Sequence, residues 1–99
     1  MKARNLSDFR REGFELGAVK VTMMSRSTCG SCARVAAQIE PVVRDHGGSL
    51  EIVDVDRSAD LAAEFGDRVP VILVDDEEVA CWEIDDDELI DAMERARGA

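Results

Sequence analysis

Apolar residues in this chain form short runs and helical repeats that alternate along the sequence. Two segments, Val19–Ser25 and Val71–Val74, are mostly apolar, which is typical of strands that are buried on both faces. Two further segments, Ser49–Val55 and Glu78–Trp82, also predict strands. The short polar link Asp75–Asp76 joins the last two strands, so we expect them to pair as an antiparallel hairpin.

The longest helical repeat is predicted over Gly30–His46. Its apolar positions recur three or four residues apart and share one helical face, formed by Val35, Ile39, Val42 and Val43. Pro41 interrupts this repeat, because proline lacks a backbone donor and clashes with the preceding turn. We therefore expect a kink or a break near Gln38–Glu40, and an end at Gly47–Gly48, where both residues tolerate positive φ.

Two shorter helices complete the pattern, one over Ala59–Phe65 and one that begins at Asp85–Asp87 and ends near Arg97. A helix separates the first two strands, so they should be parallel with a right-handed crossover. The order β-α-β-α-β-β-α predicts an α/β fold, with a four-stranded mixed sheet and helices on both faces. Residues 18–99 form this domain, and residues 1–17 precede it as an N-terminal extension, either a short helix or a loose tail.

Composition and charge exclude several classes of protein. The net charge of −10 argues against nonspecific binding to nucleic acid or to anionic membranes. No segment reaches the roughly 18 apolar residues that span a bilayer, and the N-terminus has no apolar signal-peptide core. We therefore expect a cytoplasmic monomer whose three cysteines are reduced thiols, and in that compartment a C-x-x-C pair is usually catalytic or binds metal.

The candidate chemistry lies in Cys29-Gly30-Ser31-Cys32, between the first strand and the longest helix. A strand, a short loop, a C-x-x-C pair and a helix form the layout of a thioredoxin-like redox site. Only a thiolate attacks a disulfide, and a helix N-terminus lowers the pKa of a thiol. We therefore assign Cys29 as the nucleophile and the more buried Cys32 as the resolving thiol. Arg26 and Arg34 flank the pair and would add positive potential, unless Arg26 is only a solvated loop residue.

The alternative for the same pair is half of a zinc site. A complete site needs two more ligands, and only Cys81 and His46 remain. His46 stands at the far end of the predicted helix, about four turns away, so we expect no metal. An iron–sulfur centre shared by two chains at Cys29 is a further alternative.

Three motifs together resemble a small glutaredoxin-like family of the thioredoxin superfamily, composed mostly of bacterial proteins. They are the pair Cys29–Cys32, the run Gly66–Val71, and Val79–Trp82 after the hairpin. The resemblance implies a thioredoxin-like fold of the glutaredoxin type and thiol–disulfide oxidoreductase activity. It also implies that Pro70 is the cis-proline that faces the redox pair, with the backbone of Val69 pairing with a disulfide substrate. A trans proline at the start of a strand is the alternative.

The expected strand order places more residues at the rim of this site. The third strand would begin beside the cysteine pair, at Pro70, and the fourth would end there. Trp82 would form one wall of a substrate groove or cover the sheet edge, and Cys81, on the opposite face, would be a buried inert thiol. The residues expected to contact substrate are Thr28, Arg68, Val69, Pro70 and Trp82.

Several positions depart from the pattern that the resemblance implies. Thr28 stands where thioredoxins carry Trp, and Arg68 replaces the Thr of the glutaredoxin Thr-Val-Pro motif. Trp82–Ile84 occupies the region of the Gly-Gly pair that lets glutathione approach. We expect no bound cofactor, and we keep glutathione or another low-molecular-weight thiol as the candidate co-substrate.

The sequence thus predicts a dithiol oxidoreductase that acts on a disulfide-containing protein or on a small-thiol disulfide. Its electrons would come from a reductant that no motif identifies. The competing prediction is a non-catalytic thioredoxin-like module for binding or redox sensing. That alternative is favoured by the missing Gly-Gly pair and by the strong negative charge.

Overall fold

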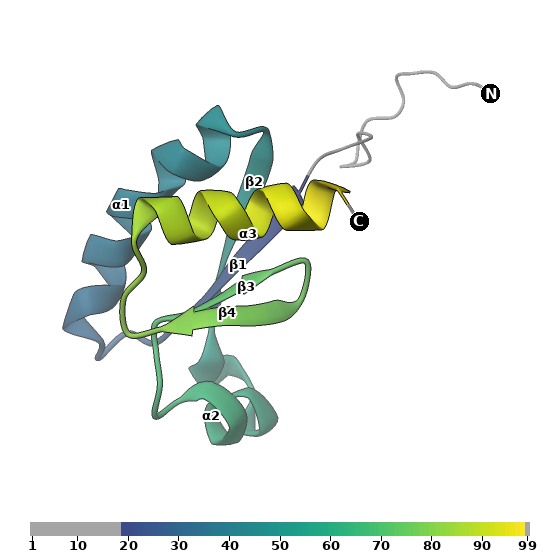
Figure 1. The fold of residues 1–99 in the computed structure, drawn as a ribbon. Coiled ribbons are helices and arrows are strands. Elements are labelled where there is room, and N and C mark those ends of the chain that lie inside the picture. Colours follow the sequence, from purple (N-terminus) through teal and green to yellow (C-terminus); the bar gives the residue numbers. More distant parts are fainter. Residues whose placement is uncertain (1–18, 99) are drawn as a thin grey trace, which may run out of the picture.

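The structure, a computed structural model, describes residues 19–98 (Figure 1). The predicted N-terminal extension, residues 1–17, lies outside the described residues. The elements follow one another as β1 (Val19–Ser25), α1 (Gly30–Asp45), β2 (Gly48–Asp54), the 3₁₀ turn η1 (Val55–Arg57), α2 (Ala59–Phe65), β3 (Val71–Val74), β4 (Glu77–Cys81) and α3 (Asp86–Gly98). This order confirms the predicted α/β fold.

The four strands form one mixed sheet in the order β2-β1-β3-β4. β1 pairs with β2 in parallel and with β3 antiparallel, and β3 and β4 form an antiparallel hairpin. In register, Met24 lies opposite Val71, and Val71 lies opposite Cys81. The end of β1, the start of β3 and the end of β4 therefore meet at one end of the sheet, as predicted.

Helices cover both faces of the sheet: α1 and α3 lie on one face and α2 lies on the other (Figure 1). Alternate residues of β1 point to opposite faces. Val21 and Met23 accordingly pack with α1 and α3, while Met24 packs with Phe65 of α2. The sheet thus separates two apolar cores.

The two cores differ in size. The large core, under α1 and α3, consists of Val19, Val21, Met23, Cys32, Val35, Ile39, Val43, Ile72, Val74, Ile84, Leu89, Ala92 and Met93. The small core, under α2, consists of Met24, Val55, Phe65, Val71 and Leu73. Most of the apolar surface that the domain buries therefore lies on the α1–α3 side.

Helix α1 runs without a break from Gly30 to Asp45, although Pro41 lies inside it. The break that we considered near Gln38–Glu40 does not occur. A proline removes one backbone hydrogen bond of a helix, and the apolar face on either side of Pro41 holds α1 to the sheet. The residues of this face that are at most 1% exposed are Val35, Ile39 and Val43. Packing here outweighs the local preference of proline.

Residues with positive φ close two turns at the end of the sheet where β1 begins. Asp75 and Asp76 have φ of 50° and 72°, the conformation that a type I′ hairpin turn requires at both central positions. Gly47, with φ of 78°, lies between α1 and β2. Both turns lie where the sequence predicts them.

Strand β4 ends at Cys81, one residue earlier than predicted. Trp82 leaves the strand with φ of 72°, a left-handed conformation that is uncommon for a bulky residue. Its backbone N–H donates to the carbonyl oxygen of Pro70, with an N···O distance of 2.8 Å. The strand alternation that would place Trp82 and Cys81 on opposite faces therefore does not apply.

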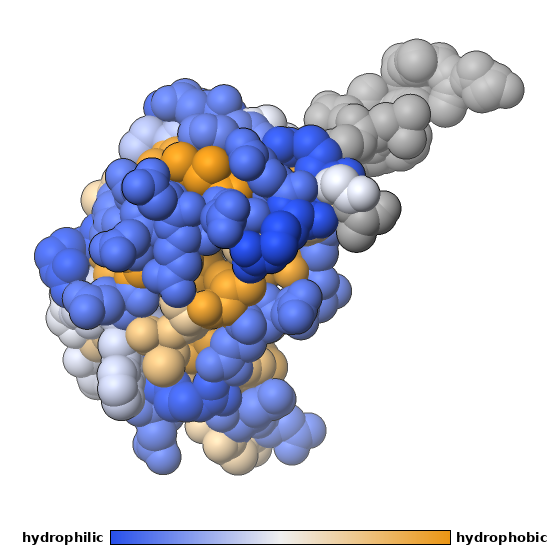
Figure 2. Space-filling view, viewed as in Figure 1, coloured by the Kyte–Doolittle hydropathy of each residue, from blue (hydrophilic) through white to orange (hydrophobic). Residues whose placement is uncertain are grey.

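The face of the molecule in Figure 2 is mostly hydrophilic, and hydrophobic residues show in the seams between elements. One such seam lies between α3 and the β3–β4 hairpin, where Val74, Val79, Ala92 and Ala96 line a hollow. Within residues 19–98, no helix combines the length and the apolar character needed to cross a lipid bilayer.

Candidate redox site at the N-terminus of helix α1

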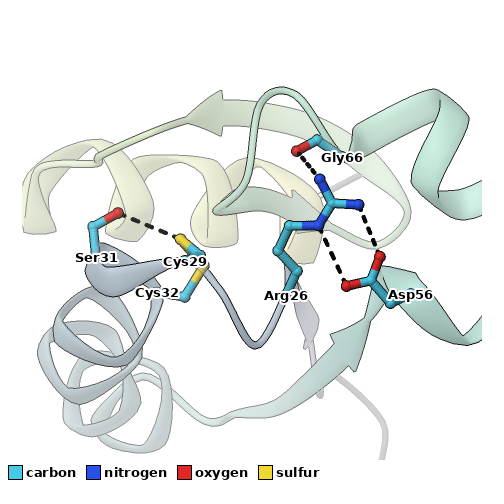
Figure 3. Close-up of a disulfide and its surroundings, with 6 residues drawn as sticks. All are labelled: Arg26, Cys29, Ser31, Cys32, Asp56 and Gly66. Carbon is cyan, nitrogen blue, oxygen red and sulfur yellow. Dashed lines mark hydrogen bonds and ion pairs between the residues drawn. A yellow bond between two sulfur atoms is a disulfide. The ribbon is translucent and has the colours of Figure 1, made fainter.

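Cys29 and Cys32 form a disulfide at the start of α1 (Figure 3). Cys29 is the N-cap residue, with φ and ψ of −90° and 108°, and Cys32 lies in the first turn. Their Cα atoms are 5.5 Å apart, a usual separation for a disulfide. The backbone N–H of Cys29 donates to the carbonyl oxygen of Arg26 (N···O 3.0 Å), so a tight turn leads from β1 into the helix.

The two cysteines differ in their surroundings. Cys32 is 5% exposed and belongs to the large core, whereas Cys29 is partly exposed. The hydroxyl oxygen of Ser31 lies 3.5 Å from the Cys29 sulfur (Figure 3), and the first turn of α1 holds no acidic residue. A helix N-terminus and a nearby hydroxyl both stabilise a thiolate, so this geometry favours negative charge on Cys29 in the reduced protein.

Arg26 connects three loops beside the disulfide. Its guanidinium donates to both carboxylate oxygens of Asp56, at 2.8 and 3.4 Å, and to the carbonyl oxygen of Gly66 at 3.1 Å. Figure 3 shows the side chain directed away from the disulfide, toward these two partners. Arg26 therefore fixes the loop before Cys29 to the loops on either side of α2, which is more than the role of a solvated residue.

Charge and hydrogen bonding at this junction reinforce one another. The hydrogen bond from Arg26 holds the pKa of the Asp56 carboxyl below its usual value, and the same contact raises the pKa of Arg26. Gly66 completes the junction, because the atoms around it leave no room for a side chain at this position. A Cβ atom there would lie 2.5 Å from the carbonyl oxygen of Ala62 and 3.1 Å from the guanidinium.

Pro70 lies at the sheet end that holds the disulfide. The Val69–Pro70 peptide bond is cis, and Pro70 is almost completely buried. Val69 is partly buried and packs against both cores. Because Val71 pairs with Met24 at the end of β1, the Val69–Pro70 peptide lies close to the loop that carries Cys29.

Trp82 and Cys81 lie next to Pro70. Trp82 is 62% exposed, so its indole is available to solvent, while its backbone is bonded to Pro70. Cys81 is a free thiol that is partly exposed and packs against the small core. The prediction of a buried Cys81 is therefore wrong, because β4 is the edge strand on this side of the sheet.

Thr28 and Arg68, which the sequence also assigned to substrate contact, have different surroundings. Thr28 is exposed in the loop before Cys29. Arg68 forms an ion pair with Glu78 and donates to the carbonyl oxygen of Glu64 at 2.9 Å. Its guanidinium also lies 5.5 Å from the centre of the Phe65 ring, and the bond to Glu78 raises its pKa. Arg68 thus ties α2 to β4.

Metal ligands do not gather in the part of the chain that the structure describes. Among residues 19–98, no three His, Cys, Asp or Glu side chains come close enough to hold a metal ion. His46 is the C-cap residue of α1, and its Nδ1 lies 2.9 Å from the carbonyl oxygen of Val42. It is therefore at the opposite end of the helix from the cysteine pair.

The sequence did not predict that two further residues, Asp56 and Ile52, lie near the disulfide. Asp56 lies in η1, and only the fold brings it to Arg26. Ile52 of β2 lines a hollow beside the disulfide. A strand pattern shows that Ile52 is apolar, but it does not show whether a neighbouring element covers it.

Comparisons with known sequences agree with this geometry. Residues 20–94 match the family model described as "Glutaredoxin-like domain (DUF836)". The uncharacterized protein Rv0508 of Mycobacterium tuberculosis is 39% identical over 75 residues, which cover 71% of this chain and 77% of the relative. The uncharacterized protein Mb0520 of Mycobacterium bovis matches with the same identity and coverage.

Solved structures show the same fold. A mutant thioredoxin from Halobacterium salinarum superposes with a TM-score of 0.59 at 27% identity, covering 78% of this chain and 73% of that chain. Protein Ne2328 from Nitrosomonas europaea gives a TM-score of 0.62 at 25% identity, covering 72% of this chain and 86% of that chain. The predicted thioredoxin-like fold is confirmed.

Proposed function

The chain belongs to the glutaredoxin-like domain family, and from this premise we propose that it is a thiol–disulfide oxidoreductase. The observation that carries the proposal is the Cys29–Cys32 disulfide at the N-terminus of α1, beside the Val69–Pro70 peptide. A pair that closes without disturbing the helix can pass between dithiol and disulfide while the rest of the fold stays in place.

The reaction begins with the reduced protein. The Cys29 thiolate attacks one sulfur of the substrate disulfide, so a bond forms between the two sulfurs and the second substrate sulfur leaves as a thiolate. Cys32 loses its proton to solvent and attacks the Cys29 sulfur, which releases the remaining substrate thiol. The substrate has then gained two electrons and two protons, and the protein is in the disulfide form of Figure 3.

The two cysteines differ in burial, and this difference determines which step each of them can perform. Cys29 is partly exposed and can meet a substrate, whereas Cys32, at 5% exposure, can reach little besides Cys29. Among residues 19–98 the buried polar or charged residue is Thr22, so no buried carboxylate of the described chain can accept the Cys32 proton. Proton loss from Cys32 to solvent would therefore follow the formation of the mixed disulfide.

The rim of the site would align the substrate. The backbone of Val69, before the cis bond to Pro70, would pair with the backbone of a disulfide-bonded segment, and Trp82 would form one wall. Thr28 is exposed on the same loop as Cys29. The proposed co-substrate that returns electrons is glutathione or another low-molecular-weight thiol, and the proposed setting is a monomer in the cytoplasm.

Trapping of the mixed disulfide tests the assignment of the two cysteines. We expect Cys32→Ser to accumulate a covalent adduct with a disulfide substrate, because the resolving thiol is gone, and Cys29→Ser to accumulate none. Mass spectrometry of the intact protein measures both. Equal adduct formation by the two variants contradicts the assignment. If the wild-type protein turns over no disulfide with any thiol reductant, the binding or redox-sensing module is the better description.

A further inference from the structure

A hollow of about 290 Å³ lies directly beside the disulfide, on the β2 side. Both cysteines line it, and much of its remaining wall is apolar, formed by Met23, Ala33, Ala36 and Ile52. β2 and β3 flank β1 on opposite sides. The hollow therefore lies on the flank of the disulfide that faces away from Pro70, and the proposed function leaves it unused.

A second hollow of about 330 Å³ continues along the seam between α1 and β2. Ile52 lines both hollows, and Val43, Gly48 and Leu50 form the apolar wall of the second. Arg44 and Glu40, joined by an ion pair at 2.8 Å, line the same hollow and make part of its wall polar. We call the two hollows together the α1–β2 groove.

Ile52 is the most informative residue of the groove. Its side chain is 48% exposed, and within the described residues the other large hydrophobic side chain with high exposure is Trp82, at 62%. A single exposed isoleucine needs no explanation by itself. Ile52 differs because it is the common wall of two hollows, one of which contains the reacting sulfurs.

The edge of β2 adds a second means of recognition. Within residues 19–98, β2 pairs only with β1, so its other edge offers unpaired backbone N–H and C=O groups. Leu50 and Ile52 lie opposite Val21 and Met23 of β1, which places both on the α1 face. Their spacing of two residues equals the side-chain period of an extended peptide.

From these observations we propose that the α1–β2 groove binds an extended apolar segment of the polypeptide that carries the substrate disulfide. The backbone of the segment adds to the edge of β2, and alternate apolar side chains enter the groove against Ile52 and Leu50. The inference rests on the proposed function and deepens it, because it makes the substrate a protein or peptide disulfide rather than the disulfide of a small thiol.

The length of the groove supports a polypeptide occupant. From Gly48 to Ile52 the strand covers about 13 Å, at about 3.3 Å per residue, and the hollow beside the disulfide extends the groove further. An extended chain fills such a length while its cysteine reaches Cys29. A low-molecular-weight thiol occupies only the part next to the sulfurs.

Two synthetic peptide disulfides test the proposal. In one peptide each cysteine has leucine on both sides, and in the other it has serine. We expect the wild-type protein to have the higher kcat/KM for the leucine peptide, through a lower KM. Ile52→Ser should reduce the ratio of the two kcat/KM values about fivefold, because the partly exposed isoleucine loses its apolar contact with the bound peptide.

Glu51→Ser is the matched control. Glu51 is exposed on the same strand, but it pairs in register with Thr22 and so faces away from α1. This variant should keep the wild-type ratio. An unchanged ratio in Ile52→Ser overturns the inference while leaving the proposed function intact. Absence of turnover with both peptides and with hydroxyethyl disulfide overturns the proposed function, and the inference falls with it.

Amide hydrogen exchange gives a readout that does not depend on turnover. The leucine peptide is trapped as a mixed disulfide on Cys29 in the Cys32→Ser protein. We expect slower exchange at Ser49–Asp54, because the peptide backbone pairs with the edge of β2. Protection confined to the segment around Val69 and Pro70 would show that the groove stays empty and would overturn the inference.

Sedimentation equilibrium tests whether a second copy of this chain, rather than a substrate peptide, occupies the α1–β2 groove. We expect the full-length wild-type protein and Ile52→Ser both to be monomers. A wild-type dimer that Ile52→Ser dissociates would mean that a second copy fills the groove, and this result overturns the proposal.

The peptide kinetics of a variant that lacks residues 1–17 test another occupant, the N-terminus of this chain. If this variant prefers the leucine peptide and the full chain does not, the N-terminus fills the groove, and the proposal is overturned as well.

Discussion

The two sides of the sheet are held together in different ways. The side of α1 and α3 contains the large core and includes Cys32, so apolar packing fixes the Cys32 sulfur. The side of α2 has only the small core, and two arginines add polar contacts to it. Arg26 holds the loops around α2 through Asp56, and Arg68 ties α2 to β4 through Glu78. Packing thus holds α1, the helix that bears the cysteines, whereas polar contacts hold the loops around α2.

The strongest test of this contrast removes a side chain from the large core. Ile39 is fully buried in α1, so Ile39→Ala should lower the free energy of unfolding by about 4 kcal/mol, from lost transfer energy plus a cavity. Urea unfolding of the reduced protein measures the change. A loss below about 1 kcal/mol would mean that α1 is not held by packing.

The matching change in the small core should have a smaller effect. Phe65→Ala removes more atoms than Ile39→Ala, but Phe65 is 6% exposed and lies in a short helix that can settle toward the sheet. We therefore expect a loss of about 2 kcal/mol, below the usual range for such a change. If the same urea experiment gives a loss as large as that of Ile39→Ala, the two cores are equivalent and the contrast fails.

A substitution at Trp82 should change the stability of the fold by a smaller amount and in the opposite direction. Its φ of 72° is strained for any residue with a Cβ atom, and glycine adopts it freely. Trp82→Gly should therefore stabilise the fold by about 0.5 kcal/mol after the entropy of glycine is counted. It should also raise KM for a disulfide peptide, because the exposed indole is lost.

Trp82→Ala is the control for this change, since alanine keeps the strained backbone. Differential scanning calorimetry should place its melting temperature below that of Trp82→Gly, while both variants show the same rise in KM. Equal melting temperatures would show that the backbone at this position stores no strain.

The smallest expected effect concerns the pH dependence of the Arg26–Asp56 contact. The pKa of Asp56 is lowered in the folded protein, so its ionised carboxylate contributes stability that is complete above about pH 5. This contribution is lost as the pH falls through the lowered pKa, below the ordinary aspartate value of about 3.9. Asp56→Asn should be less stable than wild type at neutral pH, and the difference should shrink at about pH 3.

Urea midpoints of both proteins across this range check the prediction. Glu94→Gln is a control, because Glu94 is an exposed carboxylate of α3 that lies outside the first turn of its helix. A difference between wild type and Asp56→Asn that stays constant down to about pH 3 would show that ionisation of Asp56 is not linked to folding.

Local patterns predicted most of the fold. The apolar run Val71–Val74, the Asp75–Asp76 turn and Ser58, whose hydroxyl accepts from the N–H of Leu61, each specify their structure through neighbouring residues. The sequence also predicted that Cys29 and Cys32 lie at the start of a helix. These features depend on spacing within one element, and spacing is visible in a sequence.

The remainder depends on contacts between distant segments. Pro41 is tolerated because the large core holds α1 on both sides of it. Trp82 has a positive φ while its N–H bonds to Pro70, a residue 12 positions away in the sequence. Asp56 meets Arg26 across 30 positions of sequence. No local pattern contains these contacts, and the exposure of Ile52 depends in the same way on which elements cover β2.

The unpaired edge of β2 also affects how the protein behaves at high concentration. An apolar edge strand is a template for pairing between copies of a chain, and charged residues on the strand oppose such pairing. Glu51 and Asp54 are exposed on β2, and the whole chain carries a net charge of −10. At neutral pH this charge repels other copies while still admitting a neutral or basic peptide. Near the isoelectric point of about 4.4 the repulsion disappears, and we expect sheet-to-sheet aggregation to begin at this edge.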